Sequence, residues 1–233
     1  MCDTREIAEL ERLLTIGDDV MKNNACGRGL KMIEECQERE QVDYIANLLV
    51  LHLLDLTRFS DAMKCINLML DSKETVVQWN GHCAKIEYFK KNNNLLNLKN
   101  TIEDAKAFAK KEDNEQMLIH LYKEDGKTLI YENRMEEAIK VFAEMEFLSD
   151  KYHRNDMLAI SKYYSAICLY RLGLFFMAND KLRETTEIAQ CVKNQKIAFQ
   201  SEIVRAFFLM ENGKNEDVKT ILKDCVDNFS MLL

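Results

Sequence analysis

Cysteine and histidine are the residues of this sequence that could bind a metal ion or supply a nucleophile. The eight cysteines stand at positions 2, 26, 36, 65, 83, 168, 191 and 225, and the four histidines at 52, 82, 120 and 153. Zinc sites draw their ligands from closely spaced pairs. The sequence has no Cys-x-x-Cys or His-x-x-x-His pair, and only His82 and Cys83 are adjacent. The spacing therefore predicts no metal site and does not frame a Cys–His protease.

Two cysteines fall on apolar helical stripes, Cys65 and Cys168. In such positions cysteine is typically a small core residue, so we expect both to be buried. A helical chain of 233 residues has enough core without covalent cross-links. We therefore expect free thiols and no native disulfide.

Glycines and paired acids could hold a phosphate or perform acid–base catalysis. Gly27 and Gly29 form the only close glycine pair, without the third glycine and the preceding strand of a phosphate-binding loop. The acids of Asp18-Asp19 and of Glu34-Glu35 are adjacent, so they point in different directions on a helix and cannot act as an acid–base pair. The sequence thus predicts no catalytic residue and no cofactor, and indicates a protein that is not an enzyme.

The elements that would position any such residues are predicted to be helices. The chain contains no proline and only seven glycines, whereas sheet folds depend on such turn residues. Its net charge of −7 argues against a nucleic-acid surface. The most apolar window, Ile45 to Leu56, is far shorter than the ~20 residues of a membrane span. The first residues lack a signal-peptide pattern, so we expect a cytoplasmic and nuclear protein without membrane or nucleic-acid partners.

A loop followed by an amphipathic helix recurs along the chain, with a small residue in the first turn of each helix. These small residues are Ala62, Ala138, Ala178 and Val218. They are separated by 76, 40 and 40 residues, so the first interval hides one further copy, expected around Asn100. We expect the four small residues to pack where paired helices approach closely, as alanine does in tetratricopeptide repeats.

The repeat predicts a right-handed superhelical solenoid of about six helix pairs. Each helix carries one apolar stripe, and a single pair cannot bury both of its stripes, so successive pairs must stack. One stripe is Met135, Ala138, Ile139, Phe142 and Met145, and the next is Ile160, Tyr163, Tyr164 and Ile167. We interpret residues 1–233 as one tetratricopeptide-like solenoid without a winged helix, with an irregular first copy near 20–45 and later copies near 46–85, 86–122, 123–160, 161–200 and 201–233.

Aromatic and basic pairs are the remaining candidates for contact with a partner. Trp79 and the pair Phe175-Phe176 could anchor an interface, since aromatic residues dominate binding hot spots. At helical spacing, however, aromatic residues more often belong to the core, and we expect that here. The pairs Lys90-Lys91 and Lys110-Lys111 could contact an acidic partner, but we expect solvated helix ends.

The order of the segments resembles a family of proteasome lid subunits. The stretch from Leu48 to Ala62 is similar to the family's helix, short loop and aromatic-x-x-Ala helix start. The stretches 84–95, 124–147 and 158–164 resemble the family's next helices, and 204–224 its last repeat before the winged helix. The chain thus resembles the helical-repeat, PCI-family part of non-ATPase lid subunit 6 of the proteasome regulatory particle, whose close relative is signalosome subunit 2.

This resemblance implies a non-catalytic scaffold in ubiquitin-dependent protein degradation. The family's helical arm bridges the regulatory particle and the core particle or ATPase ring, so the implied partners are lid neighbours, the ATPase ring and the core α-ring. The missing winged helix departs from the family pattern.

Two alternatives remain beside the scaffold. One is a tetratricopeptide-like adaptor that binds a peptide or helix of a partner protein in its concave groove. It would be favoured by an inward placement of Asn93, Asn97, Asn100, Asn133 and Arg134. The other is an enzyme, which would need a pocket with strongly perturbed titrating groups.

Overall fold

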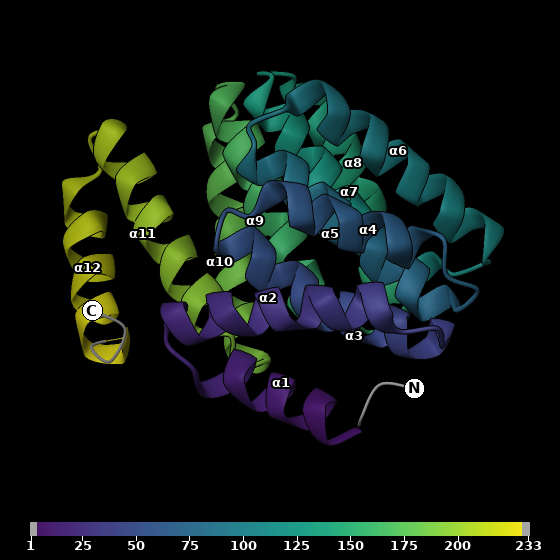
Figure 1. Ribbon diagram of the computed structural model, residues 1–233. Helices are drawn as coiled ribbons and strands as arrows, with labels where there is room; N and C mark the ends of the chain where they lie inside the picture. Colours follow the sequence, from purple (N-terminus) through teal and green to yellow (C-terminus); the bar gives the residue numbers. More distant parts are fainter. Residues whose placement is uncertain (1–3, 230–233) are drawn as a thin grey trace. The chain divides into compact units, whose positions relative to one another are not determined.

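The computed structural model describes residues 4–229, and in this range every regular element is a helix (Figure 1). The predicted all-helical fold class is therefore confirmed for these residues. The twelve helices are α1 (Thr4–Ile16), α2 (Asp19–Glu35), α3 (Arg39–Asp55), α4 (Phe59–Leu70), α5 (Thr75–Lys91), α6 (Leu95–Lys111), α7 (Glu115–Tyr131), α8 (Met135–Lys151), α9 (Asn155–Arg171), α10 (Phe175–Cys191), α11 (Gln195–Glu211) and α12 (Asn215–Phe229).

The helices belong to two compact units, with the boundary between Phe108 and Ala109 inside α6. Unit 1 contains α1 to α5 and most of α6, and unit 2 contains α7 to α12. Continuity of one solenoid across this boundary stays a prediction.

Nearly every pair of successive helices from α3 onward is joined by the same tight turn, in which one residue adopts a left-handed conformation. In the turn before α8, for example, Asn133 has a φ of 61°. Its N–H bonds to the carbonyl of Ile130 at 3.0 Å, and the N–H of Arg134 bonds to Leu129 at 2.9 Å. This pattern is a Schellman ending, which satisfies the free carbonyls of the helix. The residues with positive φ are Thr57, Asn93, Asp113, Asn133, His153, Gly173, Lys193 and Gly213.

From Asn93 onward these left-handed residues recur every 20 residues, so the period of a helix pair is 40 residues. The helices α5 to α11 each have 17 residues, which leaves three for every connection between them. The hidden copy therefore has its small-residue position at Leu98, 40 residues before Ala138, and not at Asn100. Leu98 is 5% exposed. The earlier interval is shorter because α4 has only 12 residues.

The core of unit 1 is centred on α3, which contacts α2, α4 and α5. Eight residues of α3 are buried, including Leu49 and Leu53, and both belong to the unit's main hydrophobic cluster. Ala62 on α4 lies in the same cluster with no exposed surface, beside Cys65. The small residue thus lies at the contact between helices.

The core of unit 2 is built from helix pairs that approach closely at small residues. Ala138 on α8 and Ala178 on α10 are fully buried, and Val218 on α12 is 8% exposed. Where α7 meets α8, a Cβ atom added to Gly126 would lie 2.4 Å from Cζ of Phe142. The glycine is therefore required by the buried phenylalanine ring, which also stacks on Tyr164 at a centroid distance of 5.5 Å.

The two predicted stripes of unit 2 differ in their burial. On α8, four of the five predicted residues are buried, and Ile139 is partly buried. On α9, the predicted stripe of Ile160, Tyr163, Tyr164 and Ile167 is partly buried, with Tyr163 packed against a core cluster and Tyr164 stacked on Phe142. The buried residues of α9 are mostly small: Ala159, Ser161, Ser165, Ala166 and Cys168, together with Leu169. Because α9 packs against both α8 and α10, its close contacts need small side chains, and the large ones occupy the remaining face.

Candidate functional site

The odd-numbered helices of unit 2 lie next to one another along one side. Besides its neighbours in sequence, α9 contacts both α7 and α11. Within the described part of the chain, α10 makes no contact of similar extent with α8 or α12. The odd-numbered helices are therefore closer to one another than the even-numbered ones, as on the inner side of a curved helical repeat.

The 40-residue period places equivalent side chains on this side of each odd-numbered helix. We call nine of these residues the odd-helix face, and none of them is fully buried. They are Lys123, Lys127 and Ile130 on α7, Tyr163, Ile167 and Tyr170 on α9, and Ile203, Phe207 and Met210 on α11.

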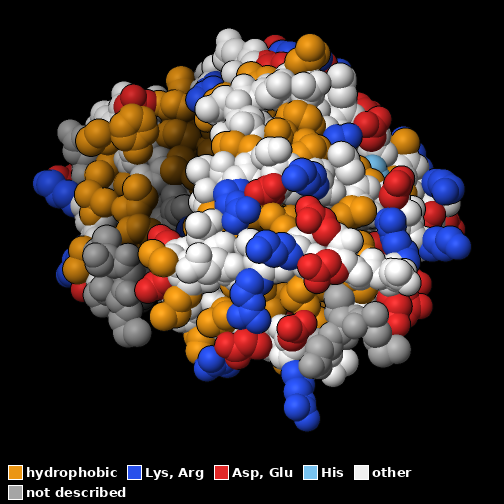
Figure 2. Space-filling model, viewed as in Figure 1, with side chains coloured by type: hydrophobic (Ala, Val, Ile, Leu, Met, Phe, Trp, Pro, Cys, Tyr) orange, Lys and Arg blue, Asp and Glu red, His pale blue; other side chains and the backbone are white. Residues whose placement is uncertain are grey.

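The part of the face on α11 is the most exposed. Ile203, Phe207 and Met210 are 38%, 49% and 51% exposed, and their spacing of four and three residues puts them on one stripe. Figure 2 shows hydrophobic side chains gathered on the surface over α11 and α12. Contiguous apolar surface of this kind marks interaction sites, whereas scattered single residues do not.

The part of the face on α9 is aromatic and held in place by packing. Tyr163 packs edge-on against Tyr164 at 5.3 Å between ring centroids, and Tyr170 stacks on Phe208 at 3.6 Å. Burial raises the pKa of Tyr163, so its hydroxyl group stays protonated at neutral pH and can donate a hydrogen bond. These rings lose little conformational entropy when a partner binds.

The part of the face on α7 is basic. Lys123 and Lys127 lie 3.3 and 3.8 Å from the carboxylate of Glu124, and the Lys127 ammonium group is 6.0 Å from the ring centroid of Tyr164. Burial, followed by the charges of Lys123 and Arg154, lowers the pKa of His120 on the same helix. The histidine is therefore neutral at pH 7, and the two lysines supply the positive charge at this end of the face.

The polar residues expected to line a peptide groove are not on this face. Asn93 and Asn133 are left-handed turn residues, and Arg134 pairs with Glu132 and Glu137 beside its own turn. Asn97 and Asn100 are exposed on the even-numbered helix α6. The inward placement that would have favoured a polar peptide groove is therefore not found for these residues.

The prediction that Phe175 and Phe176 belong to the core is wrong. They are 42% and 81% exposed, although Phe175 packs on Tyr170 at 5.2 Å and the Lys214 ammonium group lies 5.7 Å from the Phe176 ring. The 40-residue period could have predicted this exposure, because Phe176 follows Glu136 by 40 residues and Glu136 is also exposed. Trp79 is partly buried in unit 1.

Cys65 and Cys168 are both fully buried, as expected. Burial raises the pKa of the Cys65 thiol to about 12 and that of Cys168 to about 11, so both are poor nucleophiles at neutral pH.

Among residues 4–229, no three His, Cys, Asp or Glu side chains form a group that could hold a metal ion. None of the described helices is both long and apolar enough to span a membrane.

The exposed stripe on α11 was not predicted from the sequence. The repeat period could have indicated it, because Ile203, Phe207 and Met210 follow Tyr163, Ile167 and Tyr170 by 40 residues. When each helix is considered alone, the spacing of both triplets predicts an apolar stripe that belongs to the core. Only the pairing of helices shows that this side remains uncovered.

No protein-family model matches the sequence, and no curated protein matches it. Solved structures do match. A signal-transduction ATPase with numerous domains and a tetratricopeptide repeat sensor, from Pyrococcus horikoshii, superposes with a TM-score of 0.70 at 13% identity, over 96% of this chain and 38% of that chain. BtubC from P. vanneervenii gives a TM-score of 0.75 at 8% identity, over 96% and 92% of the two chains. Aspartyl phosphate phosphatase F from Bacillus subtilis gives 0.73 at 10% identity, over 97% and 65%.

At these identities the similarity shows the fold alone. The chain has a tetratricopeptide-like helical-repeat fold, and it spans 38% of the length of the Pyrococcus protein. None of these three structures is a proteasome lid subunit. The resemblance to the lid family therefore stays a prediction.

Proposed function

We propose that this protein is a non-catalytic adaptor whose odd-helix face binds a helical or extended segment of a partner protein. The observation that carries the proposal is the exposed stripe of Ile203, Phe207 and Met210 beside the packed aromatic residues of α9. An apolar stripe in a groove is the usual complement of an amphipathic helix with anchors at i, i+3 or i+4 and i+7. The alternative adaptor interpretation of the sequence is thus the one that we favour.

The composition of the face defines the chemistry of the partner segment. Its apolar anchors would cover α9 and α11, where burial of one side chain the size of Phe207 contributes about 1.5–3 kcal/mol. Acidic residues at its other end would lie near Lys123 and Lys127. The lysines are partly neutralised by Glu124, so they orient the segment more than they increase its affinity.

The structural neighbours support this proposal only through their fold. The Pyrococcus protein has a tetratricopeptide repeat sensor, and the Bacillus protein is a phosphatase. An extended helical-repeat surface suits recognition of partner proteins.

The test is a selection of peptides from a displayed random library, followed by affinity measurement on the purified protein. We expect enriched peptides with apolar residues at helical spacing and an acidic end. Phe207→Asp should lower their affinity at least about tenfold, because one lost apolar anchor is worth more than 1.4 kcal/mol. The matched control is Phe147→Asp, since Phe147 is also an exposed phenylalanine of unit 2, 65% exposed, but lies on the even-numbered helix α8.

Equal loss of affinity in both variants would place the binding surface elsewhere. Failure to enrich any peptide whose binding depends on Phe207 would also contradict the proposal.

A further inference from the structure

Unit 2 contains two equivalent grooves between even-numbered helices, which differ in the side chains that cross them. The first lies between α8 and α10 with α9 as its floor, and the second lies between α10 and α12 with α11 as its floor. Residues of the two grooves correspond at a spacing of 40. The first groove can therefore serve as a template for the second.

The first groove is closed by a chain of ion pairs. The Lys181 ammonium group donates to both carboxylate oxygens of Glu146, at 2.7 and 2.8 Å. Lys162 donates to Glu184 at 2.7 Å and lies 3.7 Å from Glu146. Two lysine side chains thus span this groove and neutralise the carboxylates on its walls.

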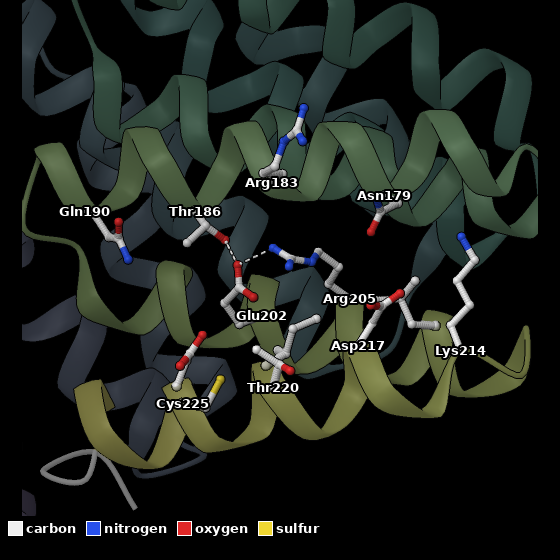
Figure 3. Close-up of a pocket in the computed structure, with 13 residues that line it drawn as sticks. Asn179, Arg183, Thr186, Gln190, Glu202, Arg205, Lys214, Asp217, Thr220 and Cys225 are labelled. Carbon is white, nitrogen blue, oxygen red and sulfur yellow. Dashed lines mark hydrogen bonds and ion pairs between the residues drawn. The ribbon is translucent and has the colours of Figure 1, made fainter.

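The second groove lacks both lysines. Ile221 stands in the place of Lys181, and Glu202 in the place of Lys162. The result is a cavity of about 450 Å³, which we call the α10–α12 cavity (Figure 3). Its size is within the range typical of small-molecule sites.

One end of the cavity carries two carboxylates, Glu202 and Asp224, and the guanidinium groups of Arg183 and Arg205 also line the cavity. Glu202 is held in place by Thr186, whose hydroxyl donates to it at 2.7 Å, and by Arg205 at 2.9 Å. Asp224 also lines the cavity and corresponds to Glu184 of the first groove. Among the described residues, Asp224 has no ion-pair partner, whereas Glu184 is bound by a lysine. This end therefore lacks the lysine ammonium group that its counterpart has.

The other end carries one lysine and one aspartate. Lys214 and Asp217 line it from the start of α12, and neither has an ion-pair partner within residues 4–229. Asn179 points into the cavity from α10 (Figure 3), and its side-chain oxygen is buried without a hydrogen-bond partner. A buried acceptor without a donor costs free energy, which a ligand with an N–H group would recover. The equivalent positions of the first groove, Ile139, Leu174 and Met177, are apolar.

We propose that the α10–α12 cavity binds a free basic amino acid, lysine or arginine. Its α-carboxylate would pair with Lys214, and its α-ammonium group would donate to Asn179 and Asp217. Its cationic side chain would reach Asp224 and Glu202, where the first groove holds its own lysine.

The dimensions of α12 agree with such a ligand. Asp217 and Asp224 are separated by seven residues, or about 10 Å along the helix axis. An extended lysine or arginine covers this distance with one hydrogen bond at each end. The site is separate from the odd-helix face, so it does not depend on the proposed adaptor function.

Titration calorimetry of the full chain with single amino acids tests the proposal. We expect one-to-one binding of L-lysine or L-arginine. L-Norleucine, which has the lysine chain without its ammonium group, should bind about tenfold more weakly or not at all, since a charge-assisted hydrogen bond contributes roughly 1.5–3 kcal/mol. N-α-acetyl-L-lysine and L-lysinamide, which lack one charge of the α-amino acid group, should also bind more weakly.

Two variants on α12 form a matched pair. Asp224→Asn should weaken binding of L-lysine about tenfold by removing the charge that faces its side chain. Asp227→Asn makes the same change at an exposed position of the same helix outside the cavity and should leave binding unchanged. Both positions are exposed, so neither change removes a core contact.

Absence of binding by both basic amino acids at millimolar concentration would overturn the proposal. So would equal affinity for norleucine and lysine, or an Asp224→Asn variant that binds like the parent. A short peptide with a carboxy-terminal lysine distinguishes the source of the ligand. If it binds as tightly as free lysine, the α-ammonium group is not recognised and the assignment to a free amino acid is wrong.

Discussion

Replacement of Gly126 by alanine tests how closely α7 and α8 must approach. The new Cβ atom would lie 2.4, 2.6 and 2.8 Å from three ring carbons of Phe142. That ring has no exposed surface and stacks on Tyr164, so it cannot turn aside without disturbing a second helix contact. Gly126→Ala therefore forces both helices apart or the ring out of its rotamer.

The expected magnitude combines two opposing effects. Overpacking of a dense core costs about 1–3 kcal/mol. Alanine in a helix interior is favoured over glycine by roughly 0.5–1 kcal/mol. Because the clash is with a ring that is fixed on both sides, overpacking should dominate, and we expect a net loss of about 1–2 kcal/mol in the free energy of unfolding.

Urea unfolding followed by circular dichroism measures this loss, with Gly27→Ala as the matched control. Gly27 lies inside α2, and an added Cβ atom there meets nothing within 4 Å. The control should therefore be stabilised by roughly 0.5–1 kcal/mol. Phe142→Leu should relieve part of the cost in the double variant with Gly126→Ala. A Gly126→Ala protein as stable as the Gly27→Ala protein would refute the packing argument.

Further predictions concern the packing, the thiols, one ion pair and the assembly state. Ala138→Leu should lower the free energy of unfolding by about 1–3 kcal/mol, because the residue is fully buried; an unchanged urea midpoint would contradict this. Alkylation of the denatured chain without reductant should modify all eight cysteines, and a protected pair would reveal a disulfide. Arg58 lowers the pKa of Asp61 through a hydrogen bond, so this carboxylate stabilises the fold at neutral pH, and its contribution is lost as the pH falls through the lowered pKa. Asp61→Asn should therefore shift the urea midpoint more at pH 7 than at acidic pH. A tagged chain on a native gel should migrate without proteasome peptidase activity, and activity in its band would favour the lid-arm interpretation over the adaptor.

The helical repeat could be predicted because its signals are local. The absence of proline, the recurring small residues and the apolar spacing all report on single helices and on their nearest neighbours. The buried positions of Ala62, Ala138 and Ala178 follow from that pattern. The shift of the hidden copy from Asn100 to Leu98 could not be predicted, because it depends on the early end of α4.

The candidate site was missed because it depends on contacts between helices. Periodicity identifies an apolar stripe but does not tell whether another helix covers it. On α9 the small residues Ala159 and Ala166 are fully buried, whereas Tyr163 and Tyr170 are only partly buried. The α10–α12 cavity was not predicted for a similar reason. It lies where Glu202 and Ile221 replace the lysines found at the equivalent positions 162 and 181. This difference is recognised only when the two grooves are compared.

The constant 20-residue spacing of the left-handed turns affects how this protein can change by duplication and deletion. A segment of 40 residues that begins and ends at equivalent turns, such as Asn133 and Gly173, can be removed or copied without changing the register of the helices on either side. Each such event would shorten or lengthen the odd-helix face by one helix. Because every repeat contacts mainly its neighbours, the remaining repeats would keep their packing. The proposed binding surface would therefore change in size through copy number, independently of point mutations within any helix.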